Sequence, residues 1–168
     1  RSARQARRNV ADGISIIQTI EGAANEVGDV LKRQRELAVQ SASETLADQE
    51  RGYLQDEYSQ LTSEIDRIAR TTEFNGVALG AFNVPGGAPL DGTTSGDLTN
   101  TIDVQAGMHN TTNDRIGIEL PSLEYDAISK HAGLGSAPLD ISTVTNGQAA
   151  ITKLDGMLDA VNKVRSTY

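Results

Sequence analysis

The feature that most constrains this chain is a helical apolar pattern that extends through about the first quarter of its 168 residues. Apolar residues recur there at alternating steps of four and three along two lines, which we call the first and second seams. The first seam consists of Val10, Ile14, Ile17, Ala24, Leu31 and Ala38, and the second of Ile16, Ile20, Ala23, Val27, Val30 and Leu37. A single apolar seam packs against one neighbouring element. Two seams therefore predict that a long helix over about residues 2–41 is contacted from two directions.

Two further segments have helical periodicity. The first carries a single seam of Leu54, Tyr58, Leu61, Ile65 and Ile68, and the second carries Ile151, Leu154, Leu158 and Val161, with Val144 before its regular part. The connection at 41–45 is short, which favours an antiparallel helical hairpin. Thr45 followed by Asp48 predicts the N-terminal cap of the second helix, and Asn75-Gly76, which tolerates left-handed backbone, is expected to end it.

The middle of the chain has a different pattern. Residues 77–83 are consistent with a short strand, and the glycines and prolines of 85–96 indicate turns. Residues 101–105 and 115–120 alternate with period two and predict a β-hairpin with a long loop. The expected fold is α+β but mainly α: an elongated antiparallel bundle of two N-terminal helices and one C-terminal helix, with a small β-hairpin region. Within one structural domain we expect an N-terminal helical hairpin (1–76), a β-hairpin and loop region (77–139) and a C-terminal helix (140–168).

Composition excludes several classes of function. The chain has two Phe and no Trp, so its core must be filled by Ile, Leu, Val and Ala, which suits slender helical bundles. The formal net charge of −8 argues against general affinity for nucleic acid or anionic lipid. There is no Cys, and no stretch approaches the roughly 18 consecutive apolar residues of a membrane span.

The residues with reactive side chains form no catalytic constellation. His109 and His131 lack a second ligand at metal spacing and are interpreted as solvated loop histidines. The carboxylates of 56–57 belong to a charged helix face, and 91–97 lacks the alternating ligands and closing Glu of a calcium loop. Asn110-Thr111-Thr112 matches a glycosylation sequon, a pattern with a high chance rate. We therefore expect no enzyme activity, no cofactor and no metal.

The start of the chain is basic. Arginines at spacings of three and four share one helix face: Arg1, Arg4, Arg7 and Arg8. This face is consistent with contact between copies, basic patch against acidic surface, and equally with a solubilising helix end. Nucleic-acid binding is disfavoured because no aromatic residues are interleaved.

Several short motifs, in their order along the chain, resemble bacterial flagellins. In the N-terminal half they are Asp12-Gly13-Ile14-Ser15, residues 18–23 (QTIEGA), residues 33–42 (RQRELAVQSA), residues 64–68 (EIDRI) and residues 72–77 (TEFNGV). Residues 149–155 and 161–166 resemble the start of the flagellin C-terminal helix. The resemblance implies a structural subunit of the extracellular flagellar filament, whose partners are other subunits and, before export, a chaperone.

The same resemblance implies a rod-domain core that lacks the terminal polymerisation helices. The alternative within the same apparatus is a hook–filament junction protein, whose terminal helical patterns are similar. The intact RxRELxVQ and FNG blocks favour flagellin. A flagellin with an enzymatic insert would need a metalloprotease motif in the middle, and the sequence has none.

The resemblance also implies a receptor site. Many flagellins are sensed by a Toll-like receptor through the surface around the RxRELxVQ segment. Matched by motif, Arg33 and Leu37 correspond to the central contacts and Glu57 to the facing contact on the second helix. The sequence departs from the family pattern at Lys32 and Gln34. The remaining candidate contacts, with the receptor or between subunits, are Arg35, Glu36 and Gln40.

Overall fold

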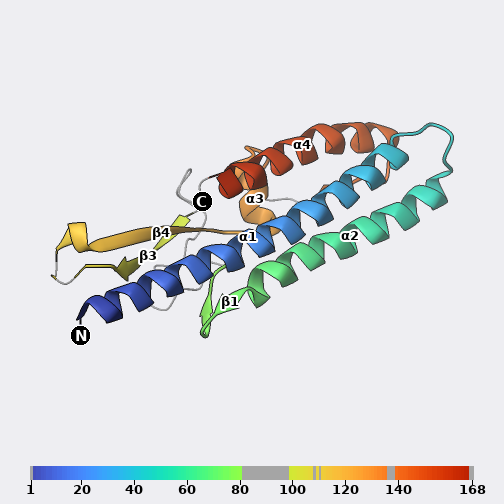
Figure 1. The fold of residues 1–168 in the computed structure, drawn as a ribbon. Coiled ribbons are helices and arrows are strands. Elements are labelled where there is room, and N and C mark those ends of the chain that lie inside the picture. Colours follow the sequence, from blue (N-terminus) through green and yellow to red (C-terminus); the bar gives the residue numbers. More distant parts are fainter. Residues whose placement is uncertain (1, 81–98, 108, 110, 136–138, 167–168) are drawn as a thin grey trace.

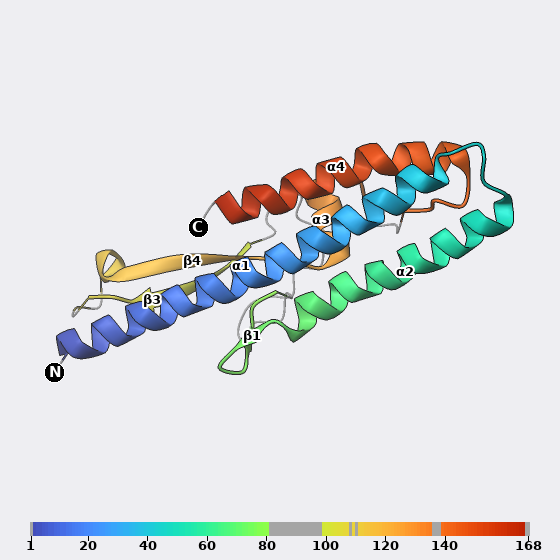
Figure 2. The same cartoon turned by 45° about the vertical axis from the view of Figure 1, so that its right-hand side comes forward.

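The computed structural model describes residues 2–80, 99–107, 109, 111–135 and 139–166. Its helices are α1 (Ser2–Ser41), α2 (Asp48–Thr71), α3 (Tyr125–His131) and α4 (Val144–Ser166), with a 3₁₀ turn at Thr112–Asp114. Its strands are β1 (Glu73–Phe74), β2 (Val77–Ala78), β3 (Thr99–Gln105) and β4 (Arg115–Pro121). Figures 1 and 2 show an elongated molecule in which α1, α2 and α4 run along the long axis. The predicted mainly α bundle with a small hairpin region is confirmed.

Helix α1 is contacted from two directions, as its two seams predicted. Its C-terminal half packs between α2 and α4, while its N-terminal half lies on the β3–β4 hairpin. The second seam is buried along both halves, with Ile16 and Ile20 against the hairpin and Val27 and Leu37 in the bundle. The first seam is only partly covered, because Ile14 is 52% exposed near the N-terminal end.

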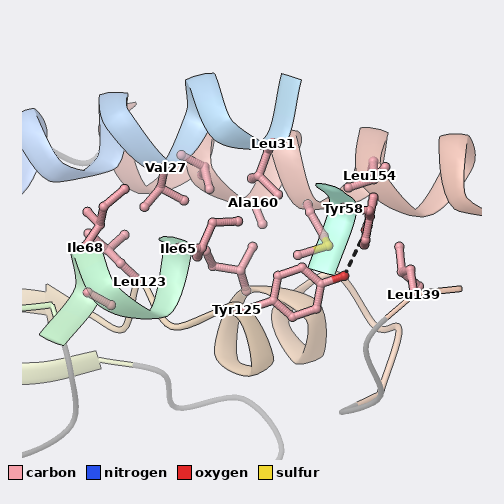
Figure 3. Packing of buried hydrophobic residues seen from close by; sticks show 14 of the residues in the cluster. Val27, Leu31, Tyr58, Ile65, Ile68, Leu123, Tyr125, Leu139, Leu154 and Ala160 are labelled. Carbon is pink, nitrogen blue, oxygen red and sulfur yellow. Dashed lines mark hydrogen bonds between the residues drawn. The ribbon is translucent and has the colours of Figure 1, made fainter. Parts of the chain in front are cut away.

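The main core lies between α1, α2, α3 and α4. Figure 3 shows residues from all four helices and from the segments before α3 and α4: Val27, Leu31, Tyr58, Ile65, Ile68, Leu123, Tyr125, Leu139, Leu154 and Ala160. Most are aliphatic, in keeping with the composition. The two buried tyrosines form a hydrogen bond with each other, and the Tyr58 and Tyr125 hydroxyl oxygens are 3.1 Å apart. Among the described residues, no helix is both long and apolar enough to cross a membrane.

This tyrosine pair predicts a loss of stability at alkaline pH. Burial raises the pKa of the Tyr58 hydroxyl above its ordinary value of 10.0, and burial also raises the pKa of Tyr125. Above about pH 10 the unfolded chain releases these protons while the folded protein keeps them, so stability is full below that pH and falls as the pH rises. Urea unfolding as a function of pH should show a shallower alkaline decline for Tyr58→Phe. Tyr53→Phe is the control, because Tyr53 is 63% exposed, and an equal effect of both changes would contradict the explanation.

The start of α2 differs from the prediction. The N-cap is Ala47, two residues after the predicted Thr45, and its N–H donates to Glu50 Oε2 at 3.0 Å. Thr45 lies in the turn, where its hydroxyl is 2.7 Å from Ser43 Oγ. The cause is a buried Arg51, which donates to main-chain carbonyls of the turn, including that of Leu46 at 2.8 Å. These bonds hold the chain in the turn until Ala47.

The prediction that Asn75-Gly76 ends α2 is also wrong. Helix α2 ends at Thr71, and the extended Thr72 caps it by donating its N–H to the Ile68 carbonyl. Asn75 and Gly76, with φ of 52° and 79°, form the two-residue turn between β1 and β2. Two successive positive φ angles are typical of a type I′ hairpin turn. The prediction that these two residues adopt left-handed backbone is thus correct, but they form the turn of the β1–β2 hairpin and not the end of α2.

The predicted hairpin of 101–105 and 115–120 is confirmed. Strands β3 and β4 are antiparallel from Thr99↔Pro121 to Gln105↔Arg115, and Ile118 and Leu120 of β4 are buried against α1. Of the strand expected over 77–83, the described residues contain Val77–Ala78. The turns expected over 85–96, together with the excluded calcium loop, lie outside the described residues, as does Asn110 of the sequon.

Helix α3 was not predicted. It is seven residues long, and its first N–H, that of Tyr125, donates to Asp66 Oδ1 of α2 at 3.0 Å. Ile128 is buried in the main core. A helix this short is stabilised by tertiary contacts rather than by its own periodicity, which is why the local pattern does not show it.

Candidate interaction surface

Three of the predicted site residues are in contact on the outer face of the bundle. Arg33 of α1 donates through Nε and Nη2 to Glu57 Oε1 of α2, at 3.0 and 2.7 Å. Its Nη1 also donates to Glu36 Oε2 at 3.1 Å. All three side chains are exposed. One planar guanidinium therefore joins two helices and presents its remaining donors to solvent.

Arg35 makes the corresponding link to α4. Its Nε is 2.6 Å from Asp155 Oδ1 and its Nη2 is 3.4 Å from Asp155 Oδ2. Hydrogen bonds from Arg35 to Asp155, and from Arg33 to Glu57, raise the pKa of the two guanidinium groups. The segment thus connects α1 to α2 on one side and to α4 on the other. Gln40, one turn beyond Glu36, is exposed on the same helix.

Leu37 is part of the core. Its side chain is 1% exposed and belongs to the main apolar cluster, so it is not accessible to a partner of the folded chain. The exposed apolar residues near this surface are Val39, at 48% exposure, and Tyr53 of α2. Val39 is not among the predicted site residues, although its position outside both seams of α1 is a signal that it faces solvent.

Gln34 is fully buried between α1 and α2. Its Nε2 donates to the Tyr58 carbonyl at 3.2 Å and to Thr62 Oγ1 at 2.8 Å. Its Oε1 has no hydrogen-bond partner among the described residues. An unpaired buried amide oxygen is destabilising.

Replacing Gln34 by leucine is therefore expected to stabilise the protein. The change removes the unpaired oxygen, and Thr62 Oγ1 keeps its own bond to the Tyr58 carbonyl at 3.1 Å. The expected gain in free energy of unfolding is about 1 kcal/mol, measured by urea denaturation. A loss of similar size would mean that the two bonds from Nε2 outweigh the unpaired Oε1.

The two histidines lie on different elements. His131 is exposed in the last turn of α3, and His109 is exposed in the loop between β3 and β4. In the part of the chain that the structure describes, no group of three or more His, Cys, Asp or Glu side chains is placed to hold a metal ion. The side chains at this surface are charged, as in Arg33, Glu36 and Glu57, or apolar and exposed, as in Val39 and Tyr53.

Comparison with known proteins identifies the family. The family model for the bacterial flagellin N-terminal helical region matches residues 1–81. The flagellin of Halalkalibacterium halodurans is 41% identical over 162 residues, which make up 96% of this chain and 52% of that protein. This chain belongs to the flagellin family.

Other flagellin relatives match over nearly the same range. The flagellar filament 30.7 kDa core protein of Treponema maltophilum is 34% identical over 99% of this chain and 55% of that protein. The crystal structure of Bacillus cereus flagellin superposes with a TM-score of 0.72 at 26% identity, covering 95% of this chain and 80% of that one. The chain spans about half the length of the curated relatives it matches.

Proposed function

We propose that this flagellin chain is the core of a structural subunit of the bacterial flagellar filament, outside the cell, and that it acts by packing against other copies rather than by catalysis. The observation that carries the proposal is the 41% identity to a flagellin over 96% of the chain. The match to a filament core protein over 99% of the chain supports it. Both matches also favour a filament subunit over a hook–filament junction protein.

The architecture suits this role. The three long helices α1, α2 and α4 share one long axis and form an extended rod against which neighbouring copies can pack. Ion pairs from Arg33 and Arg35 join the helices on the outer face. We expect the segments 1–76, 77–139 and 140–168 to act together as one structural domain.

The test is complementation of a bacterium that lacks its own flagellin with the full-length protein that contains this chain. The expected result is protein in the medium, long filaments under the electron microscope and restored swimming. Secretion without filaments would contradict the subunit role. The 168-residue chain alone is expected to be monomeric or weakly associated, and a tight, closed oligomer in sedimentation would count against the proposal. An export chaperone is the expected partner inside the cell, and co-purification from the cytoplasm tests it.

A second role is supported by the exposed Arg33–Glu57 pair: recognition by a flagellin-sensing Toll-like receptor. Arg33→Ala removes the donors that face solvent while leaving the buried core unchanged, so it is expected to weaken signalling in a receptor reporter cell at least about tenfold. Arg67→Ala is the control, because Arg67 forms a comparable exposed pair with Glu64 elsewhere on α2. Leu37 is unsuitable as a test because its replacement disturbs the core. Equal signalling by the wild type and Arg33→Ala would remove Arg33 from the site.

A further inference from the structure

The chain contains two Asn-Gly pairs, and the fold places them in different surroundings. Asn75-Gly76 forms the turn between β1 and β2, while Asn146-Gly147 lies in the first turn of α4. In such a pair the main-chain nitrogen of the glycine can attack the asparagine side-chain amide, because glycine has no side chain to shield that nitrogen. The two pairs therefore compare how the surrounding structure controls one reaction.

The Asn75-Gly76 pair is open to this reaction. Both residues are exposed, and Figures 1 and 2 show their hairpin projecting from the end of α2. Among the described residues, no hydrogen bond holds the Gly76 N–H or the Asn75 side chain. The strands on either side pair only through Glu73↔Ala78 and Phe74↔Val77. A ladder this short opens at little cost, so the turn can reach the geometry that the attack requires.

The Asn146-Gly147 pair is held away from it. The Gly147 N–H donates to the Thr143 carbonyl at 2.9 Å, and Asn146 Nδ2 donates to Asp140 Oδ2 at 2.8 Å. Gly147 is buried, and a Cβ there would lie 3.0 Å from the Ala42 nitrogen of α1. The attacking nitrogen is thus engaged in the helix, and it is released only if the start of α4 unfolds.

We propose that Asn75 is a self-modification site, at which the chain converts its own asparagine to aspartate or isoaspartate while Asn146 is spared. The Gly76 nitrogen loses its proton to solvent base and forms a bond to Asn75 Cγ. The Cγ–Nδ2 bond breaks, and ammonia leaves with a proton from solvent. Water then opens the cyclic imide: at Cγ it gives aspartate, and at the main-chain carbonyl it gives isoaspartate. The net change is amide plus water to carboxylate plus ammonium.

The two products differ in their effect on the hairpin. Aspartate tolerates the left-handed backbone of Asn75, whose φ is 52°, so the turn is kept. Isoaspartate places an additional carbon in the main chain, which a two-residue turn does not accommodate. The partly buried Phe74 and Val77 pack against the apolar cluster beneath the hairpin, and this contact is loosened. The inference is independent of the filament role, because it rests on the turn alone.

Incubation of the folded chain in heavy-oxygen water at mildly alkaline pH tests the proposal. Each converted site gains heavy oxygen from the water, and mass spectrometry of peptide fragments separates the two sites. Asn75 is expected to convert at least about tenfold faster than Asn146, because only the β1–β2 turn opens readily. In concentrated urea the two sites should convert at similar rates, since both are then unfolded Asn-Gly pairs. Equal rates in the folded chain would overturn the proposal, as would conversion of both sites in urea and of neither without it.

Hydrogen exchange tests the effect on the hairpin. The Leu79 N–H, which donates to the Thr72 carbonyl at 2.8 Å, is the reporter. After chromatographic separation, the isoaspartate form should exchange this proton at least about tenfold faster than the unmodified chain. Asn75→Asp is the matched control, because it carries the new charge without the longer main chain, and it should exchange like the unmodified chain. Equal exchange in all three forms would show that isoaspartate leaves the hairpin intact, against the proposal.

Discussion

Replacing Arg51 by methionine is expected to lower the free energy of unfolding by about 3 kcal/mol, although no apolar contact is lost. Arg51 is 4% exposed, and its Nη1 donates to the carbonyls of Ser41 and Ser43 at 2.9 and 2.8 Å, while Nη2 donates to that of Leu46. Methionine has a similar length but leaves these carbonyls without their charged donor. Because the same bonds shape the α1–α2 turn, the variant should also loosen that turn.

Chemical denaturation measures this effect. Arg51→Lys keeps the charge but lacks the planar fork, so it is expected to recover only part of the loss. Arg67→Ala is the control, because it removes an exposed arginine whose partner Glu64 is on the same helix, and no measurable change is expected. If Arg51→Met were as stable as the wild type, the turn would be held by something other than Arg51.

Replacing Gly147 by alanine is expected to destabilise the protein by about 2 kcal/mol, even though alanine is the better helix former. A Cβ at this position of α4 would lie 3.0 Å from the Ala42 nitrogen and 3.1 Å from the Ala38 oxygen. Both are main-chain atoms at the end of α1, so they cannot rotate away. The two helices would have to separate at this contact.

The same substitution at Gly22 should have the opposite sign. Among the described residues, no atom outside the neighbouring helix backbone lies within 4 Å of a Cβ at this position, so Gly22→Ala adds helix propensity without a clash and should stabilise the protein by up to about 1 kcal/mol. Thermal unfolding of the two variants side by side compares them. A stabilising Gly147→Ala would show that the α1–α4 contact adjusts at little cost.

Much of the fold could be predicted because its long elements have regular patterns. The two seams predicted both the length of α1 and its contact from two directions, and the alternation of Ile102, Val104, Ile116 and Ile118 predicted the hairpin. Helix α3 could not be predicted, since its first N–H depends on Asp66, 59 residues away. The prediction that Thr45 caps α2 was wrong for a similar reason. The turn is shaped by the buried Arg51, which the local sequence pattern shows only as one charged residue on a polar helix.

The candidate surface was harder to predict than the fold. Periodicity placed Leu37 on a seam, and the structure buries it there, so the motif that suggested the site contains both core and surface residues. The contact of Arg33 with Glu57 depends on the register of α1 against α2, which periodicity alone does not give. The position of the β3–β4 hairpin beside the first turns of α1 was also hard to predict, because Asn9 and the Gln105 carbonyl to which it donates are 96 residues apart.

Cryo-electron microscopy of the filament made by the complemented bacterium is the decisive test of the filament role. We expect a filament whose repeating subunit contains the α1–α2–α4 rod, with the surfaces of that rod in contact with neighbouring copies. A filament that lacks this chain, or a chain that is exported and remains a closed oligomer, would contradict the claim that it is a filament subunit.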